Sequence, residues 1–305
     1  MTSQTSNYIL NKVFRIEDKI VRTFKNLPTQ NRINSYPFLS SDTYFFQSDI
    51  RIDREEDLCT IEGGVEDSIV YLNGTLSESV VSCLIDVLKS RRLIFARLII
   101  GDSDFPFEES LLLELKLFFS EIYCVNYRQE TNDFVKNLPL GLESQRYRSA
   151  GQMRDFKKIP SFEPLMRPYG ILVAWNDETF VSERKEAREV LRNLPFVYEF
   201  GNRVPARMIH RIMRKSKLIA CPRGNGVDTH RFWESLYLGA VPVVLREHRL
   251  KNQDEWPLLE IDSWQQISSW NAPYLTHIYK SKVKQLREFR EIAHQFVDSL
   301  GGKNV

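Results

Sequence analysis

Hydrophobic and polar positions follow two alternating periods along most of the chain. Short apolar runs that end at polar or glycine residues predict strands at 67–74, 95–104 and 122–127. Between these runs, apolar residues recur every three to four positions and predict helices at 77–91 and 110–121. Strands that alternate with helices are typical of βαβ units, so this half is predicted to hold a parallel sheet.

The alternation stops at residues 151–169, which carry three prolines and two basic clusters, and then resumes. The second series predicts strands at 170–176, 196–201, 217–222, 240–245 and 257–262, and helices at 180–194, 205–216, 228–239 and 279–300. We therefore expect two α/β domains, residues 1–160 and 161–305, with a ligand in the cleft between them. Residues 1–55 are polar and irregular and predict no element.

Composition adds limits rather than a function. The 305 residues are 42% hydrophobic and 27% charged with a net charge of +2, which is typical of a globular protein and does not by itself indicate nucleic acid. Four cysteines lack metal-site or paired spacing, and three have apolar neighbours, which favours a reducing compartment. No signal peptide or membrane span is recognisable, so we expect a cytoplasmic protein. The basic stretch 203–217 is interpreted either as a solvated helix face or as a surface for an anionic ligand or lipid, which leaves peripheral membrane contact open.

One segment, "CPRGNGVDTHRFWESLYLGAVPVVL" at 221–245, carries the chemistry. Its glycines, Gly224 and Gly226, are expected to take positive φ and to let the backbone approach a ligand, with Asp228 as the helix N-cap. A glycine turn that leads into a helix N-terminus can bind a phosphate, and Arg223 adds a bidentate cation. The alternative is a plain βα turn with an exposed arginine. Gly239 is placed where a helix ends.

The same segment resembles the donor-site signature of exostosin-like glycosyltransferases, in which a CPRG-type strand end precedes an RFWE-containing helix and a PVV strand. The similarity extends to "LIIGDSDFPF", "YCVNY", "LPLGLES", "ILVAWNDETFVSERKEARE" and "PLLEIDSWQQI", and it covers about residues 95–270. It implies a GT-B fold, with two Rossmann-like domains that have parallel sheets facing a central cleft. It also implies an inverting hexosyl- or pentosyltransferase that uses a nucleotide-sugar, with UDP favoured, and an acceptor that is a glycan, glycolipid or glycoprotein.

The resemblance also assigns roles to residues. The donor diphosphate is expected to be held by Arg223, Gly224, Asn225 and Gly226, with Asp228 and Arg231 close to it. Arg203, at another strand end that faces the cleft, is a further candidate. Glu234 is placed on the ribose hydroxyls; the alternative is an i,i+3 ion pair with Arg231. No metal and no cofactor are expected, because the "DSD" at 102–104 lies in the acceptor half.

An inverting transfer also needs a base for the acceptor hydroxyl. The candidates are Asp102 and Asp104, which follow an apolar strand and are otherwise turn formers, and then Glu143. Trp175 is a candidate for stacking on a sugar or base, whereas Trp233 is expected in the core.

Other functions stay open at this stage. A GDP-fucose-dependent α-fucosyltransferase of the same fold has a similar donor helix, although "CPRGNG" favours the exostosin-like family. A glycan-binding protein without turnover would keep the fold. A nucleic-acid binder would use the basic stretch 203–217, and its ligand binding would fall steeply with salt.

Overall fold

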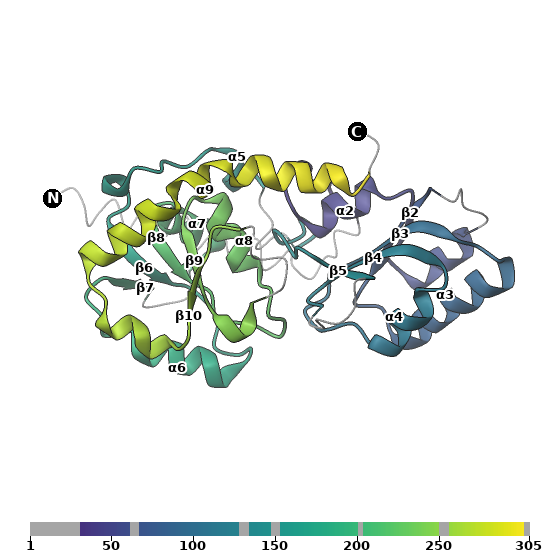
Figure 1. Cartoon of the computed structure of the whole chain (residues 1–305), viewed down its shortest axis with the longest axis horizontal. Coiled ribbons are helices and arrows are strands. Elements are labelled where there is room, and N and C mark those ends of the chain that lie inside the picture. Colours follow the sequence, from purple (N-terminus) through teal and green to yellow (C-terminus); the bar gives the residue numbers. More distant parts are fainter. Residues whose placement is uncertain are drawn as a thin grey trace.

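The computed structural model describes residues 31–61, 67–127, 134–147, 153–200, 204–249 and 256–301. They form two α/β domains that lie side by side along the long axis of the molecule (Figure 1). Within these ranges, no helix combines the length and the apolar character that crossing a bilayer requires.

The N-terminal domain is built on a sheet of five parallel strands in chain order. These are β1 (Ile50–Ile52), β2 (Ile69–Asn73), β3 (Phe95–Gly101), β4 (Phe119–Val125) and β5 (Val135–Leu138). Its helices are α2 (Ser41–Gln47), the 3₁₀ helix η1 (Glu55–Thr60), α3 (Glu78–Arg91) and α4 (Glu109–Leu115). Ile69 and Tyr71 of β2 enter one hydrophobic core, and Val70 and Leu72 enter the other. Both faces of the sheet are thus buried, which explains its continuous apolar runs.

The C-terminal sheet is also parallel, in the order β10-β9-β8-β6-β7. Its strands are β6 (Tyr169–Val173), β7 (Val197–Glu199), β8 (Ser216–Ala220), β9 (Val241–Leu245) and β10 (Leu259–Ile261). The helices around it are α5 (Arg154–Lys157), α6 (Val181–Leu191), α7 (Ala206–Met213), α8 (His230–Tyr237) and α9 (Ala272–Ser299), with 3₁₀ turns η2 (Pro164–Met166), η3 (Arg246–His248) and η5 (Trp264–Ser269). The chain leaves β6 toward β7 and later returns to its other side as β8. The strand order therefore reverses between β6 and β8, the position where such sheets bind ligands.

The predicted fold class is confirmed: the chain forms two Rossmann-like α/β domains with parallel sheets, as expected of a GT-B fold. Several elements differ from the prediction, and α2 and β1 form within residues 1–55, where no element was expected. The predicted helix 110–121 ends at Leu115, because Phe119 and the residues after it pair with β3 as β4. Helix α9 begins at Ala272 rather than 279, because the Asn271 side chain caps it by accepting from Tyr274 N–H. Strand β5 was not predicted.

Helix α9 ties the two domains together. It runs from the C-terminal domain to the N-terminal domain along the top of Figure 1. At its end, the Ser299 carbonyl accepts from Arg97 Nη1 of β3 at 3.0 Å, and His294 lies 2.5 Å from the Tyr36 hydroxyl. The last helix of the chain therefore packs on the first domain.

The cysteine expectation is only partly right. Cys124 and Cys221 are buried, but Cys59 and Cys83 are exposed, and all four are free thiols. Cys83 has apolar neighbours in sequence, yet it occupies the outer face of α3, where the neighbouring apolar residues point to the core. Sequence neighbours on a helix do not share a face.

Candidate functional site

A small pocket of about 230 Å³ lies at the point where the C-terminal sheet reverses its strand order. The loop after β6 contributes Trp175, Asn176 and Thr179, and the loop after β8 contributes Gly224, Asn225, Gly226, Asp228 and Thr229. The N-terminal domain closes it with Asp104 and Leu140. The predicted donor segment is therefore brought to an interdomain cleft. Trp175, the predicted stacking residue, lines it, and Trp233 is buried in the core as expected.

The two glycines of the donor loop serve a different purpose from the one predicted. Neither has a positive φ, unlike Gly239 after α8, whose φ of +73° confirms its role at the helix end. A Cβ on Gly226 would lie 2.5 Å from the Asn126 amide of the other domain, and one on Gly224 would lie 3.1 Å from the Arg184 guanidinium. The glycines are needed for close approach to neighbouring side chains.

Two arginines face the pocket, and Arg223 lies beside it. Arg184 of α6 lines the pocket and donates from Nε to the Arg223 carbonyl at 2.8 Å. Arg231, in the first turn of α8, is the second lining cation. The Arg223 guanidinium stacks over the Phe180 ring, 4.0 Å from its centroid, and donates to the Asn225 carbonyl at 3.0 Å. Arg203 lies outside the described residues.

Glu234 is not among the residues that line the pocket. Its carboxylate is buried and pairs with Arg231 Nη1 at 2.5 Å, the i,i+3 contact considered above, and with His210 Nε2 at 3.4 Å. His210 Nδ1 in turn lies 3.1 Å from Asp155 Oδ2. Burial alone would raise the pKa of Glu234, but the charges of Arg231 and His210 lower it to about 2. Glu234 thus positions Arg231, and its contact with a ribose stays a prediction.

Asp228 is not the N-cap of α8, which is Thr229. Its buried carboxylate instead accepts from the Leu140 backbone N–H of the other domain at 2.9 Å and from the Trp233 indole at 2.8 Å. Its own N–H donates to Asn126 Oδ1 at 2.8 Å. Burial raises the pKa of Asp228 to about 6. Helix α8 starts later than predicted, because the Asp228 carboxylate is hydrogen-bonded to the other domain and does not cap the helix.

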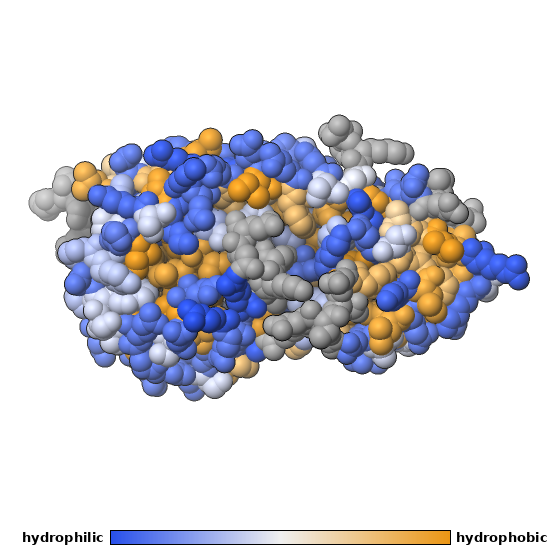
Figure 2. Space-filling model, in the orientation of Figure 1, coloured by the Kyte–Doolittle hydropathy of each residue, from blue (hydrophilic) through white to orange (hydrophobic). Residues whose placement is uncertain are grey.

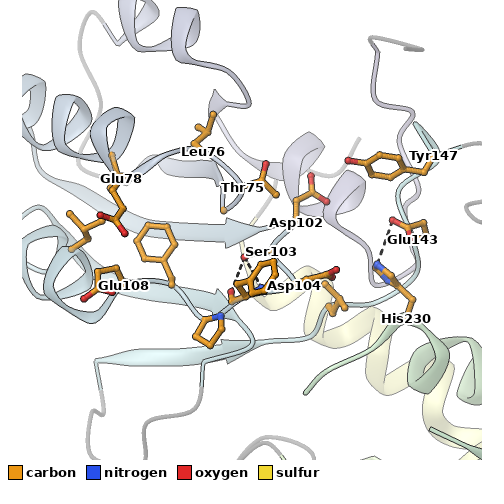
Figure 3. A pocket seen from close by; sticks show the side chains of 17 residues that line it. Thr75, Leu76, Glu78, Asp102, Ser103, Asp104, Glu108, Glu143, Tyr147 and His230 are labelled. Atoms are coloured by element: carbon orange, nitrogen blue, oxygen red, sulfur yellow. Dashed lines mark hydrogen bonds and ion pairs between the residues drawn. The ribbon is translucent and has the colours of Figure 1, made fainter. Parts of the chain in front are cut away.

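A larger pocket of about 660 Å³ opens on the N-terminal side (Figure 3). It is lined by the loops after β2, β3 and β5, the carboxyl ends of three strands, and by His230 of α8. Asp104, Leu140 and His230 line both pockets, so the two cavities are neighbours.

Asp102, one predicted base, is held by arginines. It has φ +61° and pairs with Arg32 and, at 2.6 Å, with Arg146 Nη2. Arg32 also binds Asp42 and Asp53 in this buried cluster. Burial raises the pKa of Asp102, but the two guanidinium groups outweigh it and lower the value. A carboxylate held in this way is a weak proton acceptor.

Glu143 forms a pair with His230 across the interface. Glu143 Oε1 lies 3.4 Å from His230 Nε2, and the two side chains point toward each other in Figure 3. His230 Nδ1 lies 2.8 Å from the Gly141 carbonyl, which only accepts, so Nδ1 carries a proton and Nε2 faces the carboxylate. Burial raises the pKa of Glu143. The pKa of His230 is also raised, because Glu143 and the Gly141 carbonyl outweigh burial.

Three residues of the site were missed or undervalued by sequence reasoning. From the sequence, Arg184 is a candidate for the phosphate site but is favoured as a solvated helix residue, His230 is placed only close to the phosphate, and Asn126 is given no role. Asn126 follows β4 with φ +56° and is buried, a backbone state that asparagine tolerates and that often marks functional sites. In the sequence, the polar pair Asn126 and Tyr127 directly after an apolar strand is the feature that could have identified Asn126 as a site residue.

Part of the predicted basic stretch 203–217 makes local contacts. On α7, Arg214 donates to the backbone carbonyls of Asp155 and Lys158, and His210 is buried. The basic stretch is thus partly a packing surface for α5. Within the described ranges, no three His, Cys, Asp or Glu side chains converge on a point that could hold a metal ion.

Comparison with known proteins identifies no family for this chain. No protein-family model and no curated protein matches the chain. Among similar solved structures is that of a GtfA/B complex, with 12% identity and a TM-score of 0.41 over 81% of this chain. The match covers 58% of that chain, so this protein spans a little over half of its length. At this identity the likeness says nothing about the reaction.

Proposed function

We propose that the protein is a glycosyltransferase that moves a sugar from a nucleotide-sugar to a hydroxyl of a glycan-type acceptor, with inversion. The observation that carries the proposal is the pair of adjoining pockets. One lies at the switch point of the C-terminal sheet and is lined by two arginines, and the other lies on the N-terminal domain and is lined by carboxylates. They meet at His230 and Asp104.

The donor would lie in the smaller pocket. Its diphosphate would be bound by Arg184 and Arg231, whose guanidinium groups can bond phosphate oxygens in bidentate fashion. Arg223 would support the loop by stacking on Phe180. As the sugar departs, negative charge grows on the leaving diphosphate, and cations fixed beside it stabilise that charge. The family resemblance favours UDP as the nucleotide, without a metal.

The acceptor would enter from the larger pocket. Its hydroxyl oxygen attacks the anomeric carbon from the face opposite the diphosphate, and the bond from that carbon to the phosphate oxygen breaks. The nucleoside diphosphate leaves with the bonding electrons. The hydroxyl proton passes to Glu143, which shares it with His230 Nε2. Glu143 is preferred to Asp102 because Asp102 is held by two arginines.

A nucleotide-binding experiment tests the donor site. Thermal unfolding would be followed with UDP, GDP, CMP and ADP, each with and without EDTA, on the wild type, Arg184→Ala and Arg223→Ala. At 100 times its Kd, a ligand adds about 2.7 kcal/mol, or roughly several degrees for a chain of this size. We expect a shift with one nucleotide that is insensitive to EDTA and lost in Arg184→Ala.

Lys185→Ala is the matched control, because Lys185 is the exposed neighbour of Arg184 on the same helix. It should keep the full shift. Release of nucleoside diphosphate from the matching sugar nucleotide would then show turnover. If no nucleotide at millimolar concentration shifts the wild type, the proposed donor site is wrong.

A further inference from the structure

The larger pocket has a one-sided charge. Seventeen residues line it, and five of them are carboxylates on four segments: Glu78, Asp102, Asp104, Glu108 and Glu143. No lysine or arginine is among these lining residues, all of which the structure describes. The smaller pocket next to it is lined by two arginines. The two neighbouring cavities therefore have opposite electrostatic character.

Three of the five carboxylates are free to act on a ligand. Asp102 is neutralised by Arg32 and Arg146, and Glu143 is paired with His230. Glu78, Asp104 and Glu108 are exposed and form no ion pair with a described residue. They stand on different elements around the opening: the first turn of α3, the loop after β3, and the N-cap of α4 (Figure 3).

The rest of the lining is apolar and partly aromatic. Phe105 and Tyr147 are 62% and 50% exposed, and Phe107, Leu76 and Leu111 also line the pocket. Hydrophobic patches also appear on the visible face of the N-terminal domain, among hydrophilic residues (Figure 2). Exposed aromatic faces with a few polar groups are typical of pockets for organic ligands rather than for ions. The carboxylates do not converge on a metal position within the described residues.

A cleft lined by charge of one sign focuses its field and selects ligands by charge. We propose that the acceptor is a hydroxylated ligand that is neutral or carries an amine, and that acidic sugars are excluded. This inference rests on the proposed function, because it assigns the larger pocket to the acceptor. The arrangement also keeps the anionic donor out of the acceptor pocket, since its phosphates are attracted by Arg184 and Arg231 and repelled by Asp104 and Glu108.

The test uses three p-nitrophenyl glycosides of the glucose series that differ only at C6, which is a hydroxymethyl, an aminomethyl or a carboxylate group. Their binding to the full chain is measured by saturation-transfer NMR titration at low salt, with no donor present. We expect the aminomethyl sugar to bind best and the carboxylate sugar worst. The difference between these two Kd values should be at least about tenfold, because each exposed charge contact changes affinity by about two- to fivefold.

A double variant, Glu78→Gln with Glu108→Gln, tests whether the pocket is responsible. It should reduce the tenfold difference to about threefold or less, as should raising the salt to molar concentration, where exposed charges are screened within about 3 Å. Glu55→Gln with Glu56→Gln, in η1 and outside the pocket lining, is the matched control and should leave the tenfold difference unchanged.

Equal or reversed affinities, binding of none of the three sugars, or a preference that the double variant leaves intact would each overturn the proposal. The outcome is separable from that of the proposed function. If the sugars follow the expected order but no nucleotide stabilises the protein, the pocket selects sugars by charge and the transferase assignment fails. If a nucleotide binds and the sugars show no charge preference, only the acceptor inference fails.

Discussion

The carboxylate of Asp228, in the C-terminal domain, accepts a hydrogen bond from the backbone N–H of Leu140, in the N-terminal domain, at 2.9 Å. Its other oxygen accepts from the Trp233 indole. One buried side chain therefore joins the start of the donor helix to the loop that precedes Glu143. The geometry of the cleft depends on this contact, because the residues on its two sides come from different sheets.

Asp228→Asn should weaken this junction. The asparagine amide keeps one acceptor oxygen, but its NH₂ group faces either the Leu140 N–H or the Trp233 indole N–H, which are both donors. Leaving such a buried donor without an acceptor costs about 1–3 kcal/mol. Urea denaturation measures the free energy of unfolding. Asp86→Asn, an exposed change on α3, is the control and should change this free energy by less than about 0.5 kcal/mol.

The same variant tests the raised pKa of Asp228. The folded carboxyl keeps its proton until about pH 6, whereas the unfolded one loses it near pH ~4. The folded state therefore binds more protons between these values, and wild-type stability falls as pH rises, by up to about 3 kcal/mol. Asparagine has no proton to lose, so the deficit of Asp228→Asn should shrink between pH 4 and pH 6. A deficit that is constant over this range would show that Asp228 titrates normally.

Gly226→Ala and Gly224→Ala should differ, although the residues are two positions apart. A Cβ on Gly226 would meet the Asn126 amide, which is short, buried and bonded to Asp228 N–H and the Ser103 carbonyl. A Cβ on Gly224 would meet only the end of the long Arg184 side chain. We expect Gly226→Ala to cost about 1–3 kcal/mol as an overpacked site, and Gly224→Ala less than about 1 kcal/mol. Similar losses in thermal and urea unfolding for both would contradict the close contact with Asn126.

Glu234→Gln should cost about 3 kcal/mol at pH 7, because it leaves Arg231 and the buried His210 without their shared counter-charge. The pKa of Glu234 is lowered to about 2, so its contribution is present above the unfolded value near pH ~4.3 and is lost as pH falls toward 2. The wild type and the variant should therefore converge in acid. Urea denaturation at pH 3 and pH 7 measures this, with the exposed Glu189→Gln on α6 as control. A loss of equal size at both pH values would rule out the lowered pKa.

The sequence predicted the sheet strands and helices best where apolar residues recur regularly, as in β2, α3, β8 and α8. It also placed the donor loop at a strand end, because local patterning reports burial directly. It did not predict how side chains meet across the cleft. Asp228 has the composition of an N-cap, yet its partner, Leu140, is 88 residues away in sequence. Glu143 and His230 likewise come together only when two domains dock, and no local pattern encodes that contact.

Glu143→Gln should lower kcat by about 10²- to 10⁴-fold, because the amide keeps the shape of the side chain but cannot accept the acceptor proton. The thermal shift caused by the nucleotide should be unchanged, since Glu143 does not line the smaller pocket. The raised pKa values of Glu143 and His230 also predict that the acid limb of kcat against pH lies above the ordinary glutamate value. The rate of nucleoside diphosphate release, followed against pH, measures kcat and the position of its acid limb.

Asp104→Asn and Asp102→Asn, compared with Glu143→Gln, show which of these three carboxylates is the catalytic base. Asp102→Asn removes a counter-charge from Arg32 and Arg146, so it should lower stability in urea more than it lowers kcat. Asp104→Asn should change kcat by less than about tenfold, because Asp104 is exposed at the edge of both pockets and its carboxylate is not paired with a histidine. If Asp104→Asn abolished turnover while Glu143→Gln retained it, the base would be Asp104, and the Glu143–His230 contact would serve only to dock the domains.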